Sequence, residues 1–198
     1  MDMVCEVCGQ KMVVKTIDFD YTQRAGLDPE RHVIVLKNIE SLWCDCGVAP
    51  RIPNVEGLHY TIGLVLIRDE APLDGSAVRF LRKTLGMTQR EFSATFDLTP
   101  EYYSDWERGK TLPKKPVRIA AAATFLTHLL KRREALVRMA PEYVAETVEK
   151  VTSRTLELAE RPRGRALITV DASAHPPAWK IAEFMRLEAE TGGTRHRR

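Results

Sequence analysis

The fold of this 198-residue chain is decided by residues 80–113, whose sequence is FLRKTLGMTQREFSATFDLTPEYYSDWERGKTLP. Within it, Thr88 and Glu91 have the spacing of a capping box. In such a box the Thr hydroxyl accepts from the Glu backbone N–H, and the Glu carboxylate accepts from the Thr backbone N–H. A capping box marks the start of a helix, which we expect over Gln89–Phe96.

Helix signals lie on both sides of this box. Before it, Asp74 is a suitable N-cap and Gly86 a suitable stop for a first helix. After it, Thr99 is followed by Pro100, which suits the first helical position because the N–H that proline lacks would have no partner there. Gly109 ends this third helix. Three short helices, the last two joined by a three-residue turn, predict a helix-turn-helix, whose final helix enters the DNA major groove.

The side chains of the third helix divide between core and surface. Tyr103 and Trp106 stand three residues apart, so we expect them in the core and Tyr102 on the DNA face. We expect Glu107 to pair with an arginine of the first helix, such as Arg82, rather than to act in catalysis. For the lysines near this helix, the alternative to phosphate binding is a solvated loop. The cations available for DNA phosphates are Arg79, Arg90, Lys110, Lys114 and Lys115.

All four cysteines lie in the first quarter of the chain, in two close pairs, each followed by a glycine. They are Cys5, Cys8, Cys44 and Cys46. Paired cysteines in a cytosolic protein favour a metal over disulfides, with free thiols or a redox dithiol as alternatives. Four thiolates complete the tetrahedral shell of Zn²⁺, so the predicted zinc is structural. The second pair is one residue tighter than usual, and His59 or Asp45 is the alternative fourth ligand if Cys46 points away.

Periodicity and turn residues predict elements outside the central stretch. The expected strands are Lys11–Phe19, His32–Leu36 and Ala166–Val170. The expected helices are one capped by Asn54 and ending near Arg68, then Val117–Met139, Glu142–Glu160 and an amphipathic Trp179–Leu187. We expect 161–165 to be a linker and 191–198 to be disordered. The expected division is 1–50 zinc-binding domain, 51–72 helical connector, 73–140 helix-turn-helix domain, and 141–198 helical extension with a partly disordered tail.

Charge and composition limit the function classes. Residues 1–50 carry five Lys/Arg against eight Asp/Glu, whereas 73–118 carry nine against six, which predicts different partners for the two parts. No apolar run approaches the roughly 20 residues that span a bilayer, and no secretory signal is evident, so we expect a cytoplasmic protein without membrane partners. The five histidines are scattered and no catalytic set is suggested, so we expect no enzyme.

The central stretch resembles the Xre/Cro-type helix-turn-helix. The resemblance is carried by Thr88-Gln89 at the start of the second helix, Ser104 inside the third, and Trp106-Glu107-Arg108-Gly109 at its end. With the four-cysteine segment ahead of it, the chain resembles the MqsA (YgiT-type) zinc-binding antitoxins over residues 1–116. The expected fold class is therefore mainly α, with a small β-rich zinc-binding N-terminal domain and a lambda-repressor-like helix-turn-helix second domain.

The resemblance implies a metal-stabilised N-terminal domain that binds a toxin protein. It also implies a homodimer that binds a palindromic operator in double-stranded DNA and represses its own operon. By position, Gln89 and the first turn of the third helix face bases and phosphates. Together with the exposed groups above, the expected DNA-binding residues are Gln89, Arg90, Thr99, Pro100, Glu101, Tyr102, Ser104, Asp105, Lys110 and Lys114.

The chain departs from the family pattern at four positions. Asp97 replaces the usual Gly of the turn, and Ser93 replaces the usual small Ala. Glu101 and Asp105 stand where family members often carry Asn or Arg. A carboxylate repels phosphate but accepts from cytosine N4, so either the operator carries cytosine at those steps or DNA binding is weak. Two other functions remain open: a phage- or plasmid-type repressor without a toxin, and a protein-interaction module that has lost DNA binding.

Overall fold

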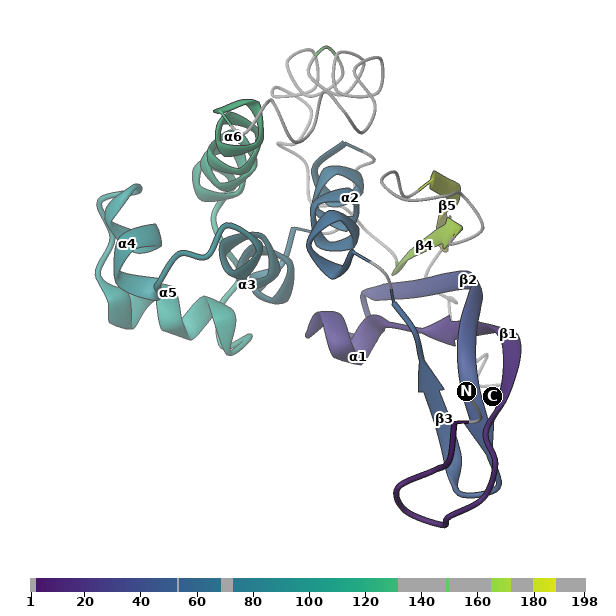
Figure 1. Ribbon diagram of the computed structural model, residues 1–198. Helices are drawn as coiled ribbons and strands as arrows, with labels where there is room; N and C mark the ends of the chain where they lie inside the picture. Colours follow the sequence, from purple (N-terminus) through teal and green to yellow (C-terminus); the bar gives the residue numbers. More distant parts are fainter. Residues whose placement is uncertain are drawn as a thin grey trace, which may run out of the picture.

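The computed structural model describes residues 3–52, 54–68, 73–131, 149, 165–171 and 180–187. Within these residues, a β-sheet formed by segments from both halves of the chain packs beside a group of helices formed by the residues between them (Figure 1). The elements follow each other in the order expected for an N-terminal β-rich part and a helix-turn-helix.

The sheet is built around the long strand β2 (His32–Cys44). Strand β1 (Val13–Asp20) pairs antiparallel with β2 along one side. On the other side, β3 (Gly47–Pro50) pairs antiparallel with the C-terminal end of β2, and β4 (Arg165–Asp171) pairs parallel with its N-terminal half. Strand β5 (Lys180–Leu187) then pairs antiparallel with β4. The parallel pair means that the chain leaves the sheet, forms the helices and returns to the same strand.

Strand β5 overturns one expectation. The predicted strand at Ala166–Val170 is confirmed as part of β4, but the predicted helix at Trp179–Leu187 is wrong, because Lys180–Leu187 is a strand. An isolated helix this short is unstable in water, whereas the free edge of β4 offers backbone partners to every second residue. Apart from the helical residue Glu149, the described part of 141–198 is therefore β, not the helical extension that we expected.

Other expectations for the C-terminal half lie outside the described residues. They are the remainder of the helix Glu142–Glu160, the linker, the tail, and the part of the helix Val117–Met139 beyond Lys131.

Helices α2 to α6 correspond to predicted helices, with small shifts at their ends, whereas the short α1 was not predicted. They are α1 (Thr22–Ala25), α2 (Val55–Arg68), α3 (Gly75–Thr84), α4 (Gln89–Ala94), α5 (Pro100–Glu107) and α6 (Lys115–Lys131). Helix α2 starts directly after Asn54, whose side-chain oxygen accepts from the backbone N–H of Gly57 at 3.0 Å. Asp74 caps α3 by accepting from the N–H of Ala77. Strands β1, β2 and β4 correspond to predicted strands with shifted ends, most of all β2, whereas β3 was not predicted.

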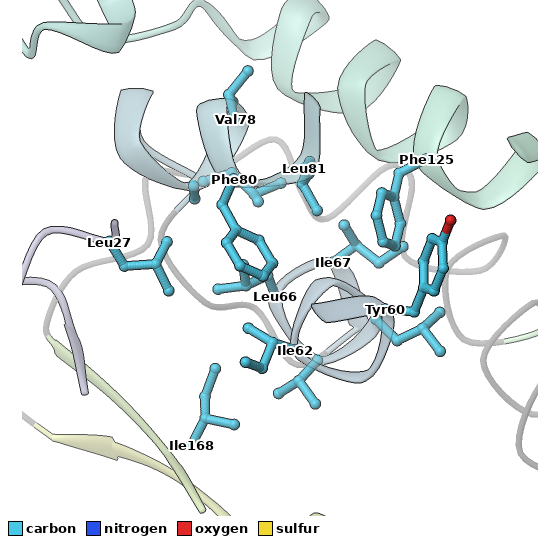
Figure 2. Close-up of a cluster of buried hydrophobic side chains, with 14 of the residues drawn as sticks. Leu27, Tyr60, Ile62, Leu66, Ile67, Val78, Phe80, Leu81, Phe125 and Ile168 are labelled. Atoms are coloured by element: carbon cyan, nitrogen blue, oxygen red, sulfur yellow. The ribbon is translucent and has the colours of Figure 1, made fainter. Parts of the chain in front are cut away.

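Helix α2 lies in the centre of the molecule. We expected a connector here, but Leu58, Ile62 and Leu66 have no exposed surface. Figures 1 and 2 show α2 between the sheet on one side and α3 and α6 on the other. Gly63 allows the closest approach to α6, because a Cβ there would lie 2.3 Å from the ring of Phe125. The apolar sequence of α2 is therefore explained by burial on several sides.

The hydrophobic core is continuous from the sheet to the helix-turn-helix. Ile34 of β2 and Ile168 of β4 belong to the same cluster of buried side chains as Leu81 of α3, Trp106 of α5 and Phe125 of α6. Figure 2 shows Ile168 below α2 and Phe125 beside it. Burial of this apolar surface holds the helices against the sheet.

Polar contacts also fasten α3 to the segment between β1 and β2. Arg79 donates to the carbonyl oxygen of Gly26 at 2.6 Å. Ser76 accepts from the backbone N–H of Asp28 at 2.9 Å, and the guanidinium of Arg31 lies 3.6 Å from the carboxylate of Asp74. These contacts place the first helix of the helix-turn-helix in a definite position against the sheet.

Candidate nucleic-acid interface and metal centre

The start of α4 has the predicted capping box. The Thr88 hydroxyl accepts from the N–H of Glu91 at 3.2 Å, and the Glu91 carboxylate accepts from the N–H of Thr88 at 2.7 Å. The hydrogen bonds from the Thr88 backbone and hydroxyl lower the pKa of Glu91 below its ordinary value, so this carboxylate stays charged. The helix then ends at Ala94, two residues before the expected end.

Helix α4 and the turn after it accommodate two of the four departures from the family pattern, Ser93 and Asp97. Asp97 takes a left-handed backbone conformation, with φ of 55°, which Asp tolerates better than most residues. Ser93 is buried, and its hydroxyl donates to the carbonyl of Arg90 at 3.1 Å, so no unpaired polar group results. Thr99 then caps α5 by accepting from the N–H of Tyr102, and Pro100 occupies the first turn, as predicted.

The aromatic side chains of α5 divide as predicted. Tyr103 and Trp106 have no exposed surface, and the ring of Tyr103 packs against Phe92 of α4 and against Trp106. Tyr102 is 38% exposed, and its ring makes an edge contact with Trp106, at 4.9 Å between centroids. One side of α5 is thus sealed in the core, while the other side faces solvent.

A buried ion pair joins the three helices of the motif. Arg82 of α3 donates to both carboxylate oxygens of Glu107, at 2.7 and 3.1 Å, which confirms the predicted pair. Arg82 also donates to the carbonyl of Met87 at 2.7 Å, and Gln89 of α4 donates to Glu107 at 2.5 Å. Burial by itself would raise the pKa of Glu107, but the hydrogen bonds from Arg82 and Gln89 outweigh it and lower this pKa. The charged pair therefore persists at neutral pH.

The side chain of Gln89 takes part in this network and is therefore not freely exposed. Its amide nitrogen already donates to Glu107 within the protein. The side chain therefore lies at the edge of the buried network, at the start of α4. Its predicted contact with DNA stays a prediction.

The exposed residues of α5 carry the other predicted contacts. Pro100, Glu101 and Tyr102 lie at the exposed start of the helix, whereas Ser104 is half-buried. Asp105 is held by two cations: Arg108 at 2.9 Å and Lys110 at 3.1 Å. The hydrogen bond from Lys110, followed by the charges of Lys110 and Arg108, lowers the pKa of Asp105. The Asp105 carboxylate therefore stays ionised, and its charge is offset by the two neighbouring cations.

The predicted phosphate-binding cations do not all remain together. Arg90, Lys114 and Lys115 are exposed around the helix-turn-helix, and Lys110 is exposed beside Asp105. Arg79 instead engages the carbonyl of Gly26, so it serves the contact with the sheet segment. Sequence reasoning missed that contact because its partners lie 53 residues apart in the chain.

The four cysteines form a second site, at the end of the β2–β3 hairpin. Their Sγ atoms all lie within 4.8 Å of one another. The Sγ of Cys46 lies 3.4 Å from that of Cys5, 3.5 Å from that of Cys8 and 3.0 Å from that of Cys44. A tetrahedral ion with metal–sulfur bonds near 2.3 Å requires sulfur–sulfur distances of about 3.8 Å. The sulfur–sulfur distances, from 3.0 Å up to less than 4.8 Å, lie on both sides of that value, so the donor set fits a metal ion held by four thiolates after small shifts of the side chains.

The placement of the four sulfur atoms supports all four cysteines as ligands. Hydrogen bonds from the backbone N–H groups of Cys8 and Val7 lower the pKa of Cys5 to about 6, which favours its thiolate, whereas the hydrogen bonds with Cys44 and Cys5 raise the pKa of Cys46. Cys46 belongs to the cluster, so the alternative with Asp45 or His59 is not needed. His59 instead shares a hydrogen bond of 2.8 Å with the hydroxyl of Tyr21.

Comparison with known proteins supports the helix-turn-helix. Residues 78–125 match the family model described as Helix-turn-helix (HTH_3), which spans most of α3, all of α4 and α5, and much of α6. The chain thus contains an Xre/Cro-type helix-turn-helix domain, which supports a DNA-binding regulator of a generally non-enzymatic class. No curated protein and no solved structure matches the chain. Within the described part of the chain, no helix combines the length and apolar composition that crossing a bilayer requires.

Proposed function

We propose that this protein is a sequence-specific transcriptional regulator that binds double-stranded DNA through α5 and holds a structural zinc ion at its four-cysteine cluster. The observation that carries the proposal is the presentation of α5. Its back is locked by Trp106 and by the pair of Arg82 and Glu107, while its first turn at Pro100 and Glu101 is exposed. A recognition helix needs this arrangement to place its N-terminal residues against base edges.

The charges around α5 agree with this role. Arg90 at α4 and Lys114 beside α6 are exposed, and cations in such positions bind phosphates and orient a protein on the duplex. The two-fold symmetry of the operators bound by such motifs supports a homodimer on a palindromic site.

The proposed binding is tested by mobility-shift titration of the full chain on its own promoter at several salt concentrations. We expect the logarithm of the affinity to fall linearly with the logarithm of the salt concentration. Lys114→Ala should make that slope shallower by about 0.9 if the lysine neutralises one phosphate. Lys15→Ala is the matched control, because it removes an equal charge from an exposed position of β1, outside the helix-turn-helix. If both variants make the salt dependence shallower by the same amount, or if the wild type does not bind its promoter, the proposed interface is excluded.

For the metal, the four thiolates favour zinc over harder ions such as magnesium, which prefer oxygen ligands. Elemental analysis of the purified protein should find one zinc per chain, and Cys8→Ser should lower that content. A chain that retains no metal after purification under reducing conditions, and gains none on titration with zinc, would contradict this part of the proposal.

Within the regulator class, we propose an MqsA-like antitoxin that represses its own operon. The support is the order of the two parts: a four-cysteine, net-acidic segment followed by a helix-turn-helix. A toxin partner should then co-purify with the chain from its host and be encoded beside it. A repressor without a toxin would bind the promoter but co-purify with no such partner. A protein-interaction module that has lost DNA binding would co-purify with a partner protein but would not bind the promoter.

A further inference from the structure

Helix α5 carries three carboxylates, and the structure gives each a different set of partners. Glu107 is buried against Arg82. Asp105 is bound by Arg108 and Lys110. Glu101 is exposed in the first turn, and within the described residues it forms no ion pair or side-chain hydrogen bond. This difference bears on the proposed DNA interface, on which the following inference rests.

The partners of Asp105 remove it from consideration as a base-reading group. Two cations within 3.1 Å of its Oδ1 atom offset its charge and occupy that oxygen. Glu101 has no such compensation, yet it occupies the turn that a recognition helix places deepest in the major groove. An uncompensated carboxylate between two phosphate strands is repelled unless the base edge itself supplies a hydrogen-bond donor.

Only one base presents a suitable hydrogen-bond donor for the Glu101 carboxylate in the major groove. In the major groove, guanine and thymine offer acceptors at O6, N7 and O4, whereas cytosine N4 and adenine N6 are donors. Adenine also presents the acceptor N7 beside its amino group, which repels the second carboxylate oxygen. Cytosine has a C–H group in the adjacent position. We propose that Glu101 is a specificity-determining residue that selects cytosine at one position of each operator half-site.

A purely structural role for Glu101 is the alternative. A carboxylate in the first turn stabilises a helix through the positive end of the helix dipole. This effect changes helix stability and overall affinity but carries no sequence information. A test of the proposal therefore measures base preference rather than affinity alone.

The experiment is selection of binding sites from a random duplex library by the full chain, followed by titration on the selected site and its single-base variants. We expect the wild type to require cytosine at one position and to lose roughly five- to hundredfold in affinity when that base pair is changed. Glu101→Ala should lose the preference at that position alone. Glu101→Gln should shift it to adenine, because a Gln amide pairs with adenine N6 and N7.

Two variants serve as controls. Glu56→Gln removes an equal charge from the first turn of α2, outside the helix-turn-helix, and should leave the selected motif unchanged. Asp105→Asn frees Lys110 and Arg108 for phosphates, so it should raise affinity for all sequences alike. Thermal unfolding of each variant shows that the fold is retained.

The outcomes separate this inference from the proposed function. If the wild type selects a motif and Glu101→Ala selects the same motif with the same base preferences, Glu101 does not read a base, although the regulator proposal stands. If the wild type selects no motif at all, the proposed function fails and the inference fails with it.

Discussion

The pair of Arg82 and Glu107 should be the main polar determinant of helix-turn-helix stability. Its two hydrogen bonds measure 2.7 and 3.1 Å, and the residues are 8% and 7% exposed. Removing one member of a buried ion pair leaves the other as an uncompensated charge, which costs about 3–5 kcal/mol. Glu107→Ala should therefore lower the free energy of unfolding by about that amount, and it also removes the hydrogen bond from Gln89.

Urea unfolding followed by circular dichroism at 222 nm measures this loss. Asp105→Ala is the matched control, since it removes a carboxylate of the same helix that pairs with the exposed Arg108 and Lys110, and exposed pairs contribute about 0–1 kcal/mol each. Replacing both buried partners, as Arg82→Met with Glu107→Leu, should recover much of the lost stability because no charge is left unpaired. A cost for Glu107→Ala no larger than that of the control would show that water reaches the pair and would refute this account.

Three further perturbations test other parts of the structure. Gly75→Ala should destabilise the protein by about 1–3 kcal/mol in urea unfolding, because the added Cβ would lie 1.8 Å from the carbonyl oxygen of Trp106. An unchanged urea midpoint would mean that α3 and α5 are farther apart than described. A zinc chelator should alter the fluorescence of Trp43, which directly precedes Cys44, with little change at 222 nm, whereas collapse of the helical signal would show that the helices depend on the metal. Stability should fall as the pH drops below about 6.5, since burial lowers the pKa of His59 and the unfolded chain takes up the proton more readily. The variant His59→Gln should show a weaker dependence over that range, and an identical dependence would assign it to other groups.

Much of the candidate site could be predicted because its interactions are local. The capping box at Thr88 and the N-cap at Thr99 depend on hydrogen bonds across three residues, so residue type and spacing suffice to locate them. The burial of Tyr103 and Trp106 follows from helical periodicity in the same way. The pairing of Glu107 with Arg82 could also be predicted, because a buried carboxylate requires a cation.

Other features could not be predicted because they depend on distant partners. Nothing local distinguishes Arg79, which binds Gly26, from a phosphate-binding arginine. Nor does sequence show that Asp105 is neutralised while Glu101 is not, since this depends on where Arg108 and Lys110 place their side chains.

By itself, the amino-acid sequence determined where the helices of the DNA-binding motif begin, which of their faces is apolar, and which cysteines are close enough in pairs to bind a metal. Only the tertiary structure decided that α2 lies at the centre of the core and that Lys180–Leu187 is a strand. It also decided that β4 pairs with β2 across more than a hundred residues. The reason is physical: caps and periodicity act within one or two turns, whereas burial and strand pairing depend on which surfaces the folded chain brings together.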